Sequence, residues 1–292
     1  MPIFTFQLIG PWTRRLAILG GFLTLIGCSI PGPKSSEEEM SLKLPHRALQ
    51  LPAGYALSYL EAGDPHGRLV VFVHGTPGEA EAWADYLMSV PAGFHYISVD
   101  RPGFGKSGPD GAVVSLPDQA KALAAIIRAN GNKPAALVGH SLGGPIIAQL
   151  AVDTPELVAA LVIVAGSLDP AQENVPFIQF VGDTWPVSAL LPRAIRNANR
   201  EIIALEPQLT ALAPRLASIK MPVTIVHGTK DDLVPFANVE FLKTHMTGTA
   251  AMDVTVVEGQ NHFLPWNSKP QVEAAIANAF RMMAAPNTGQ VP

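Results

Sequence analysis

The sequence predicts the α/β fold class, with a mostly parallel central sheet and helices on both of its faces. Two observations predict it. Short apolar runs, typical of strands buried on both faces, alternate with segments whose apolar residues recur at helical spacing. In addition, several reactive side chains directly follow these runs. Right-handed crossovers would bring those side chains to the carboxyl edge of the sheet, where ligands bind in such folds.

The expected strands follow one another along the chain. The first two, at 47–51 and 55–61, are joined by a turn at Pro52-Ala53-Gly54. Continuous apolar runs predict the other strands at 69–73, 94–99, 135–138, 158–165, 223–226 and 252–257. Helical spacing predicts helices between them, and the last helix should bury a face made of Val272, Ala275, Ile276, Ala279 and Met283.

The regular alternation of strands and helices breaks between residues 169 and 218. Phenylalanine, tryptophan and leucine residues are interspersed there with prolines, and short helical patterns follow. We interpret residues 169–218 as a cap inserted over the carboxyl edge of the sheet. Residues 45–285 then form one domain that carries this cap, and residues 286–292 form a tail.

Composition excludes several classes of function. The chain has 292 residues, of which 48% are hydrophobic and 15% are charged, so it can bury a sizeable core. Its formal net charge is −4 and it has no basic stripe, so no nucleic-acid partner is expected. The eight histidines are scattered without the spacing of metal ligands, and we expect neither a metal nor a cofactor.

The first 27 residues have the pattern of a secretory signal peptide. Arg14 and Arg15 precede an apolar run of 13 residues, Leu16 to Cys28, which is short for a transmembrane helix. The polar stretch that follows, within residues 28–44, predicts a flexible tether. An uncleaved anchor and a plain signal peptide remain alternatives.

The end of this run, Leu25-Ile26-Gly27-Cys28, resembles the lipobox of bacterial lipoproteins. That resemblance implies cleavage before Cys28, lipidation of Cys28 and an exported protein anchored in the cell envelope. Because Ser29 follows, the resemblance further implies the outer membrane, with the protein facing the periplasm. Cys28 is the only cysteine, so no intrachain disulfide can form.

One apolar run ends in Gly139-His140-Ser141-Leu142-Gly143 and is followed by a helical pattern. A Gly-x-Ser-x-Gly segment between a strand and a helix is typical of a sharp turn that exposes the serine hydroxyl. The following helix points its amino terminus at the serine, which favours negative charge developing nearby. Ser141 is therefore a candidate nucleophile.

A serine hydroxyl needs a base to take its proton, and an imidazole held by a buried carboxylate suits this task. The sequence offers both groups after later strands, in the order Ser141, Asp231 and His262. All three should fall on the carboxyl edge of the sheet.

Five segments in this order resemble the α/β-hydrolase fold superfamily, over about residues 45–285. They are His74-Gly75-Thr76-Pro77-Gly78, Asp100 to Ser107, Gly139 to Gly143, His227 to Asp231, and Gly259-Gln260-Asn261-His262. The resemblance implies that Ser141 is the nucleophile, Asp231 the acid and His262 the base. It also implies an oxyanion hole made by the backbone N–H groups of Thr76 and Leu142.

Neighbouring residues offer competing interpretations. Asp232 could replace Asp231 as the acid, although the family spacing favours Asp231. Asp169 follows an earlier strand and is more simply a turn residue before proline. The histidines His74, His140 and His227 are expected to have structural roles. The aromatic residues Trp83, Phe104, Phe263 and Trp266 could either line a pocket or pack in the core.

The expected function is hydrolysis of a small ester-like substrate with an apolar group, through an acyl-enzyme. Thioester or amide hydrolysis and cofactor-free haloperoxidase or perhydrolase chemistry would use the same triad. A surface lipoprotein that only binds ligands is the non-enzymatic alternative. The expected membrane contact is the N-terminal lipid anchor.

Overall fold

The structure is a computed structural model that describes residues 44–284. The predicted signal peptide, the lipidation site at Cys28 and the tail lie outside the described residues. In the part that is described, no helix is long and apolar enough to cross a membrane.

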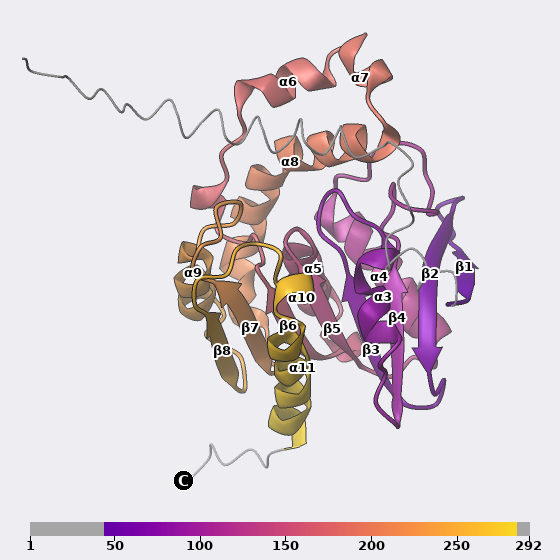
Figure 1. The fold of residues 1–292 in the computed structure, drawn as a ribbon, viewed down its shortest axis with the longest axis vertical. Coiled ribbons are helices and arrows are strands. Elements are labelled where there is room, and N and C mark those ends of the chain that lie inside the picture. Colours follow the sequence, from indigo (N-terminus) through magenta and orange to yellow (C-terminus); the bar gives the residue numbers. More distant parts are fainter. Residues whose placement is uncertain (1–43, 285–292) are drawn as a thin grey trace, which may run out of the picture.

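In the described residues 44–284, eight strands form one sheet, in the order β1-β2-β4-β3-β5-β6-β7-β8 (Figure 1). β1 and β2 are antiparallel to their neighbours, and the other strands are parallel. The predicted α/β fold class, with a mostly parallel sheet, is confirmed. The strands are β1 (His46–Gln50), β2 (Ala56–Gly63), β3 (Arg68–Val73), β4 (Phe94–Val99), β5 (Ala135–His140), β6 (Val158–Val164), β7 (Val223–Gly228) and β8 (Met252–Val257).

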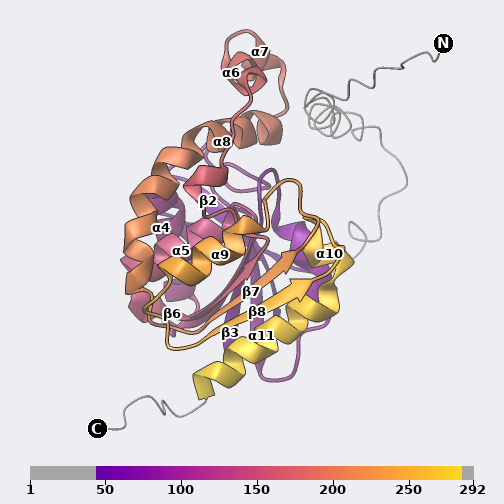
Figure 2. The same cartoon turned by 90° about the vertical axis from the view of Figure 1, so that its left-hand side faces the viewer.

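Helices cover both faces of the sheet. Figure 2 shows α4, α5 and α9 on one side and α11 on the other. The α-helices are α3 (Ala84–Leu87), α4 (Leu116–Ala129), α5 (Gly143–Asp153), α6 (Phe177–Asp183), α7 (Val187–Leu190), α8 (Arg193–Leu212), α9 (Ala237–His245), α10 (Leu264–Asn267) and α11 (Lys269–Ala284). Short 3₁₀ helices are η1 (Ala80–Trp83), η2 (Pro155–Leu157), η3 (Pro170–Gln172) and η4 (Ala213–Ser218).

The central strands are apolar throughout because both of their faces are covered. In β3, Val71 and Val73 pack into the core beneath α4 and α5, while Val70 and Phe72 pack into the core beneath α3 and α11. Successive side chains of a strand point to opposite faces, so a strand between two helical layers needs apolar residues at every position.

The last turn of α11 departs from the sequence-based prediction. Val272, Ala275, Ile276 and Ala279 are buried against the sheet, but Met283 is 42% exposed. Met283 lies near the end of the helix, where it lines an open cavity at the edge of the sheet instead of packing into the core.

The connection between β6 and β7 carries η3, α6, α7, α8 and η4. Figures 1 and 2 show α8 crossing above the sheet, with α6 and α7 farther out. We call residues 169–218 the cap. It lies over the end of the sheet at which β3, β5 and β7 finish.

Candidate active site

Ser141 lies in a turn between β5 and α5 that only glycines at its flanks allow. The backbone φ angle of Ser141 is +55°, in the left-handed region that non-glycine residues rarely adopt. A Cβ atom on Gly139 would lie 2.5 Å from the Gly143 carbonyl oxygen. A Cβ atom on Gly143 would collide with the Val73 carbonyl oxygen. The turn therefore depends on both glycines and places Ser141 at the start of α5.

Asp231 and His262 form a buried hydrogen-bonded pair. Asp231 follows β7, His262 follows β8, and the distance from His262 Nδ1 to Asp231 Oδ2 is 2.8 Å. The other carboxylate oxygen of Asp231 accepts hydrogen bonds from the backbone N–H groups of Leu233 (3.0 Å) and Val234 (2.8 Å). Because an ionised carboxylate can only accept, Nδ1 of the imidazole carries the proton and Nε2 is free to act as a base.

The two competing carboxylates lie in other environments. Asp232 is exposed next to Asp231, and no hydrogen bond in residues 44–284 joins it to His262. Asp169 accepts a hydrogen bond from the backbone N–H of Ala171 at the start of η3, as expected for a turn residue. The geometry therefore assigns Asp231 as the partner of His262.

His140 connects the serine turn to His262. The two imidazole rings lie 4.7 Å apart, and His140 Nε2 lies 3.0 Å from the His262 carbonyl oxygen, to which it donates. Burial, with a smaller contribution from His262, lowers the pKa of His140 to about 3, so the ring is neutral. No hydrogen bond within residues 44–284 joins Ser141 Oγ to His262. Such bonds are often long without substrate and tighten in the complex.

The other two buried histidines also have structural hydrogen bonds. His227 Nε2 lies 3.0 Å from the Val234 carbonyl oxygen, and burial lowers the pKa of His227. His74 Nδ1 donates to the Gly75 carbonyl oxygen at 2.7 Å. His74 Nε2 accepts a hydrogen bond from the backbone N–H of Arg101 at 3.1 Å. Burial, and then the charge of Arg101, lower the pKa of His74 well below its usual value. Both imidazole rings are therefore neutral, and their hydrogen bonds hold the surrounding loops in place.

The two predicted oxyanion donors border the serine. Leu142 directly precedes α5, and Thr76 lies in the loop after β3. A Cβ atom on Gly75 would lie 2.8 Å from Ser141 Cβ, so this loop presses against the serine turn. Among the described residues, neither the Thr76 N–H nor the Leu142 N–H donates to another protein group. Both N–H groups remain available to a ligand atom.

Sequence reasoning missed a buried ion pair behind the Thr76 loop. Arg101 follows β4 and Glu201 lies on α8, and their side chains are 0% and 2% exposed. Arg101 donates two hydrogen bonds to the Glu201 carboxylate, at 2.6 and 3.0 Å. The Thr76 hydroxyl donates to the same carboxylate at 2.6 Å, and Arg101 also donates to the Gly75 carbonyl oxygen at 2.8 Å. The ion pair therefore ties the Thr76 loop to the cap.

The amphipathic pattern of α8 contains the signal that could have revealed this pair. Leu205, Leu209 and Leu212 are the buried leucines of the helix. Glu201 falls on the same face, four positions before Leu205. A carboxylate on an apolar face indicates a buried partner, because an unpaired buried charge is costly.

Aromatic residues divide between the core and the neighbourhood of the triad. Trp83 and Phe104 are buried in the domain. Phe263 and Trp266 are partly exposed, and their rings lie 6.0 Å from His262 and 5.6 Å from His140, respectively. Only the second pair borders the candidate site.

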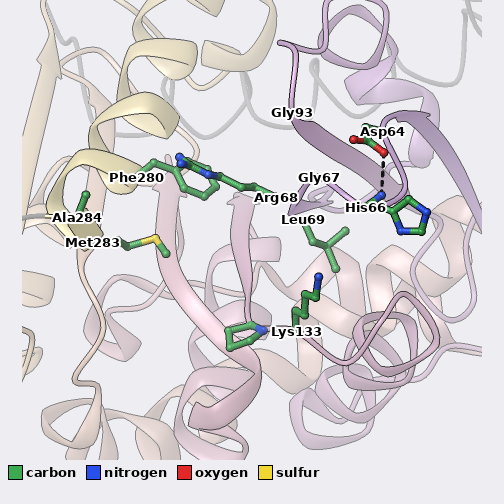
Figure 3. Close-up of a pocket in the computed structure, with 11 residues that line it drawn as sticks. Asp64, His66, Gly67, Arg68, Leu69, Gly93, Lys133, Phe280, Met283 and Ala284 are labelled. Atoms are coloured by element: carbon green, nitrogen blue, oxygen red, sulfur yellow. Dashed lines mark hydrogen bonds between the residues drawn. The ribbon is translucent and has the colours of Figure 1, made fainter.

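A cavity of about 630 Å³ lies at the opposite, amino edge of the sheet (Figure 3). Arg68, Lys133, Phe280 and Met283 line it, together with Asp64, which accepts a hydrogen bond from the His66 N–H. None of the triad residues lines this cavity. Within residues 44–284, no group of His, Cys, Asp and Glu residues could hold a metal ion.

Comparison with proteins of known sequence and structure agrees with the order and direction of the strands in the sheet. The sequence profile of the alpha/beta hydrolase fold family matches residues 68–187, which include Thr76 and Ser141. The chain has the α/β-hydrolase fold. A solved structure of a candidate lipase from Acinetobacter baumannii AYE superposes with a TM-score of 0.69, over 88% of this chain and 99% of that chain, at 18% identity.

Relatives of known name match only part of this α/β-hydrolase-fold protein, and only part of their own length is matched. The dihydrolipoyllysine-residue acetyltransferase component of the acetoin cleaving system of Cupriavidus necator is 35% identical over 201 residues, 59% of this chain and 54% of the relative. The (E)-2-((N-methylformamido)methylene)succinate hydrolase of Acinetobacter baylyi is 32% identical over 120 residues, 41% of this chain and 45% of the relative. The matches therefore span about half the length of these relatives.

Glu201→Gln should destabilise the fold, because it leaves the fully buried Arg101 without its anion. We expect the free energy of unfolding to fall by about 3–5 kcal/mol, measured by urea denaturation. Glu206→Gln on the same helix is the matched control. Glu206 is exposed, so its replacement should change stability by no more than about 0.5 kcal/mol. Equal effects of the two substitutions would contradict this role of the ion pair.

Proposed function

We propose that this protein is a serine hydrolase that cleaves carboxylic esters through an acyl-enzyme. The observation that carries the proposal is the buried hydrogen bond of 2.8 Å between His262 Nδ1 and Asp231, at the sheet edge where Ser141 sits in its strained turn. A base oriented by a carboxylate is the arrangement that activates a serine hydroxyl.

The first half of the reaction forms the acyl-enzyme. Ser141 Oγ attacks the ester carbonyl carbon while its proton moves to His262 Nε2. Asp231 stabilises the imidazolium that results. The carbonyl oxygen becomes an oxyanion, which the N–H groups of Thr76 and Leu142 would stabilise together with the amino terminus of α5. The alcohol then leaves with the proton from His262.

The second half returns the enzyme to its starting state. A water molecule gives a proton to His262 and attacks the acyl carbon, and the same N–H groups stabilise the second oxyanion. Collapse of this intermediate breaks the bond to Ser141 Oγ, which regains its proton from His262, and releases the carboxylic acid. No protein group besides the triad is needed to move protons.

The preference for an ester with an apolar group rests on the surroundings of the triad. Phe263 and Trp266 present partly exposed rings beside His262 and His140. A small set of polar groups among aromatic side chains is typical of sites for small apolar ligands. The hydrolase name of the Acinetobacter baylyi relative also supports hydrolytic chemistry.

Turnover of nitrophenyl esters tests the proposed activity. Purified protein should hydrolyse these esters, with kcat/KM that varies along a series of increasing acyl chain length. Ser141→Ala should lower kcat on the order of 10⁶-fold, because it removes the attacking atom and almost no packing. Residual activity within tenfold of the parent enzyme, in a sample shown to be folded by circular dichroism, would contradict the role of Ser141.

Substitution of the two adjacent carboxylates tests which of them orients His262. Asp231→Asn should lower kcat about 10⁴-fold, because the amide favours the wrong tautomer of His262. Asp232→Asn is the matched control and should leave kcat within a few-fold, since Asp232 is exposed and makes no hydrogen bond to His262 in the described part of the chain. The reverse ranking of the two variants would assign the acid to Asp232.

We also propose that the protein is exported and anchored to the bacterial outer membrane through lipid on Cys28. The support is the sequence: an apolar run of 13 residues behind Arg14 and Arg15 ends at the lipobox-like Leu25-Ile26-Gly27-Cys28. More than one acyl chain makes such attachment stable, at about 0.8 kcal/mol for each buried CH₂ group.

Mass spectrometry of the membrane fraction tests the anchor. The mature protein should begin at Cys28 and carry acyl chains there, and Cys28→Ser should abolish both the cleavage and the added mass. An unmodified Cys28 thiol, or an intact Met1 terminus on the membrane-bound protein, would eliminate the lipoprotein hypothesis.

A further inference from the structure

The outer part of the cap exposes an unusual number of large apolar side chains. We call residues 177–190, which form α6, α7 and their connection, the cap tip. Phe177, Trp185 and Leu190 are 80%, 83% and 84% exposed. The other exposed large apolar side chains of the tip are Ile178, Phe180, Val181 and Val187. Contiguous exposed patches of this kind mark sites that bind a partner or a membrane.

The apolar side of the tip faces away from the protein. No residue of α6 is buried, and the one buried residue of α7 is Ser188. Polar groups attach the tip to α8: Asn199 donates to the Gln179 carbonyl oxygen at 2.8 Å, and Arg200 pairs with Asp183 at 2.6 Å. A helix that covers a core turns its apolar face inward and its polar face to solvent. The tip does the reverse.

The distribution of charge suits a lipid surface. Asp183 is the only charged residue among residues 177–190, and it is paired with Arg200. Arg193 and Arg196 lie on α8 beneath the tip, both close to Asp110. Asp110 and backbone carbonyl oxygens already hold these two arginines. The match to a bilayer therefore rests on the aromatic and aliphatic side chains of the tip, which suit the acyl region.

The position of the tip adds to this argument. Figures 1 and 2 show α6 and α7 as the part of the cap farthest from the sheet, standing out beyond α8. A projecting end can enter a bilayer without burying the rest of the domain. The proposed anchor at Cys28 lies 16 positions before Leu44. A chain of that length spans at most about 55 Å, so it would keep the domain near the membrane.

We propose that the cap tip docks onto a phospholipid bilayer by inserting Phe177, Trp185 and Leu190 beneath the headgroups. The carboxyl edge of the sheet, with Ser141, then lies on the side of the molecule that faces the lipid. Docking goes beyond the proposed hydrolysis and does not require it, because none of the triad residues belongs to the tip.

Fluorescence of Trp185 in brominated vesicles tests this docking. Full-length protein is mixed with phosphatidylcholine vesicles, with or without phosphatidylglycerol, that carry bromine on their acyl chains. Subtracting the spectrum of the Trp185→Phe variant isolates the Trp185 signal. Whatever the N-terminal segment contributes to attachment, only insertion of the tip brings Trp185 within reach of the bromine atoms. We expect at least half of the Trp185 emission to be quenched.

Two control variants make the result specific. The signal of Trp266, isolated with Trp266→Phe, should stay unquenched because α10 lies in the body of the domain. Ser141→Ala should dock like the parent protein, so docking is testable even if the hydrolase proposal fails.

Three results would overturn the docking proposal. Vesicles could leave the Trp185 signal unquenched, or bromine could quench Trp185 and Trp266 equally. Trp185 could also be shielded from acrylamide without vesicles, which would show that a second copy or the chain itself covers the tip.

Discussion

The close contact of the Gly143 backbone with the Val73 carbonyl organises the candidate site. It lets α5 begin directly behind β3, so that Ser141 takes its left-handed conformation at the end of β5. The same contact brings the loop after β3 against the serine turn, because Gly75 also approaches Ser141 without room for a side chain. The close backbone contacts of Gly143 and Gly75 therefore bring Ser141 and the N–H group of Thr76 together.

A second constraint connects that arrangement to the cap. The Glu201 carboxylate is buried and accepts hydrogen bonds from both Arg101 and the Thr76 hydroxyl. Buried ion pairs add little net stability but are costly to break. Here the ion pair fixes α8 above the Thr76 loop. The cap tip is attached to α8 by polar groups, and its apolar side chains therefore point outward at the same end of the molecule as Ser141.

Local patterns in the sequence predicted the sheet well, because each buried strand is a short apolar run. They also indicated the pairing of Asp231 with His262, because both follow parallel strands and must reach the same edge. The pair of Arg101 and Glu201 was not predicted, since these residues lie 100 positions apart and meet only through the direction of α8. The exposure of Phe177 and Trp185 was not predicted either. An apolar segment has the same sequence pattern whether it packs into a core or faces outward.

Covalent labelling with a fluorophosphonate, followed by peptide mapping, tests the central claim most directly. This probe phosphonylates a serine only where a base activates its hydroxyl and a preformed site accepts the charged oxygen. We predict one adduct, on Ser141, that is lost when His262 is replaced by alanine or when the protein is unfolded beforehand. A folded protein that stays unlabelled, or that carries its adduct on another serine, would contradict the assignment.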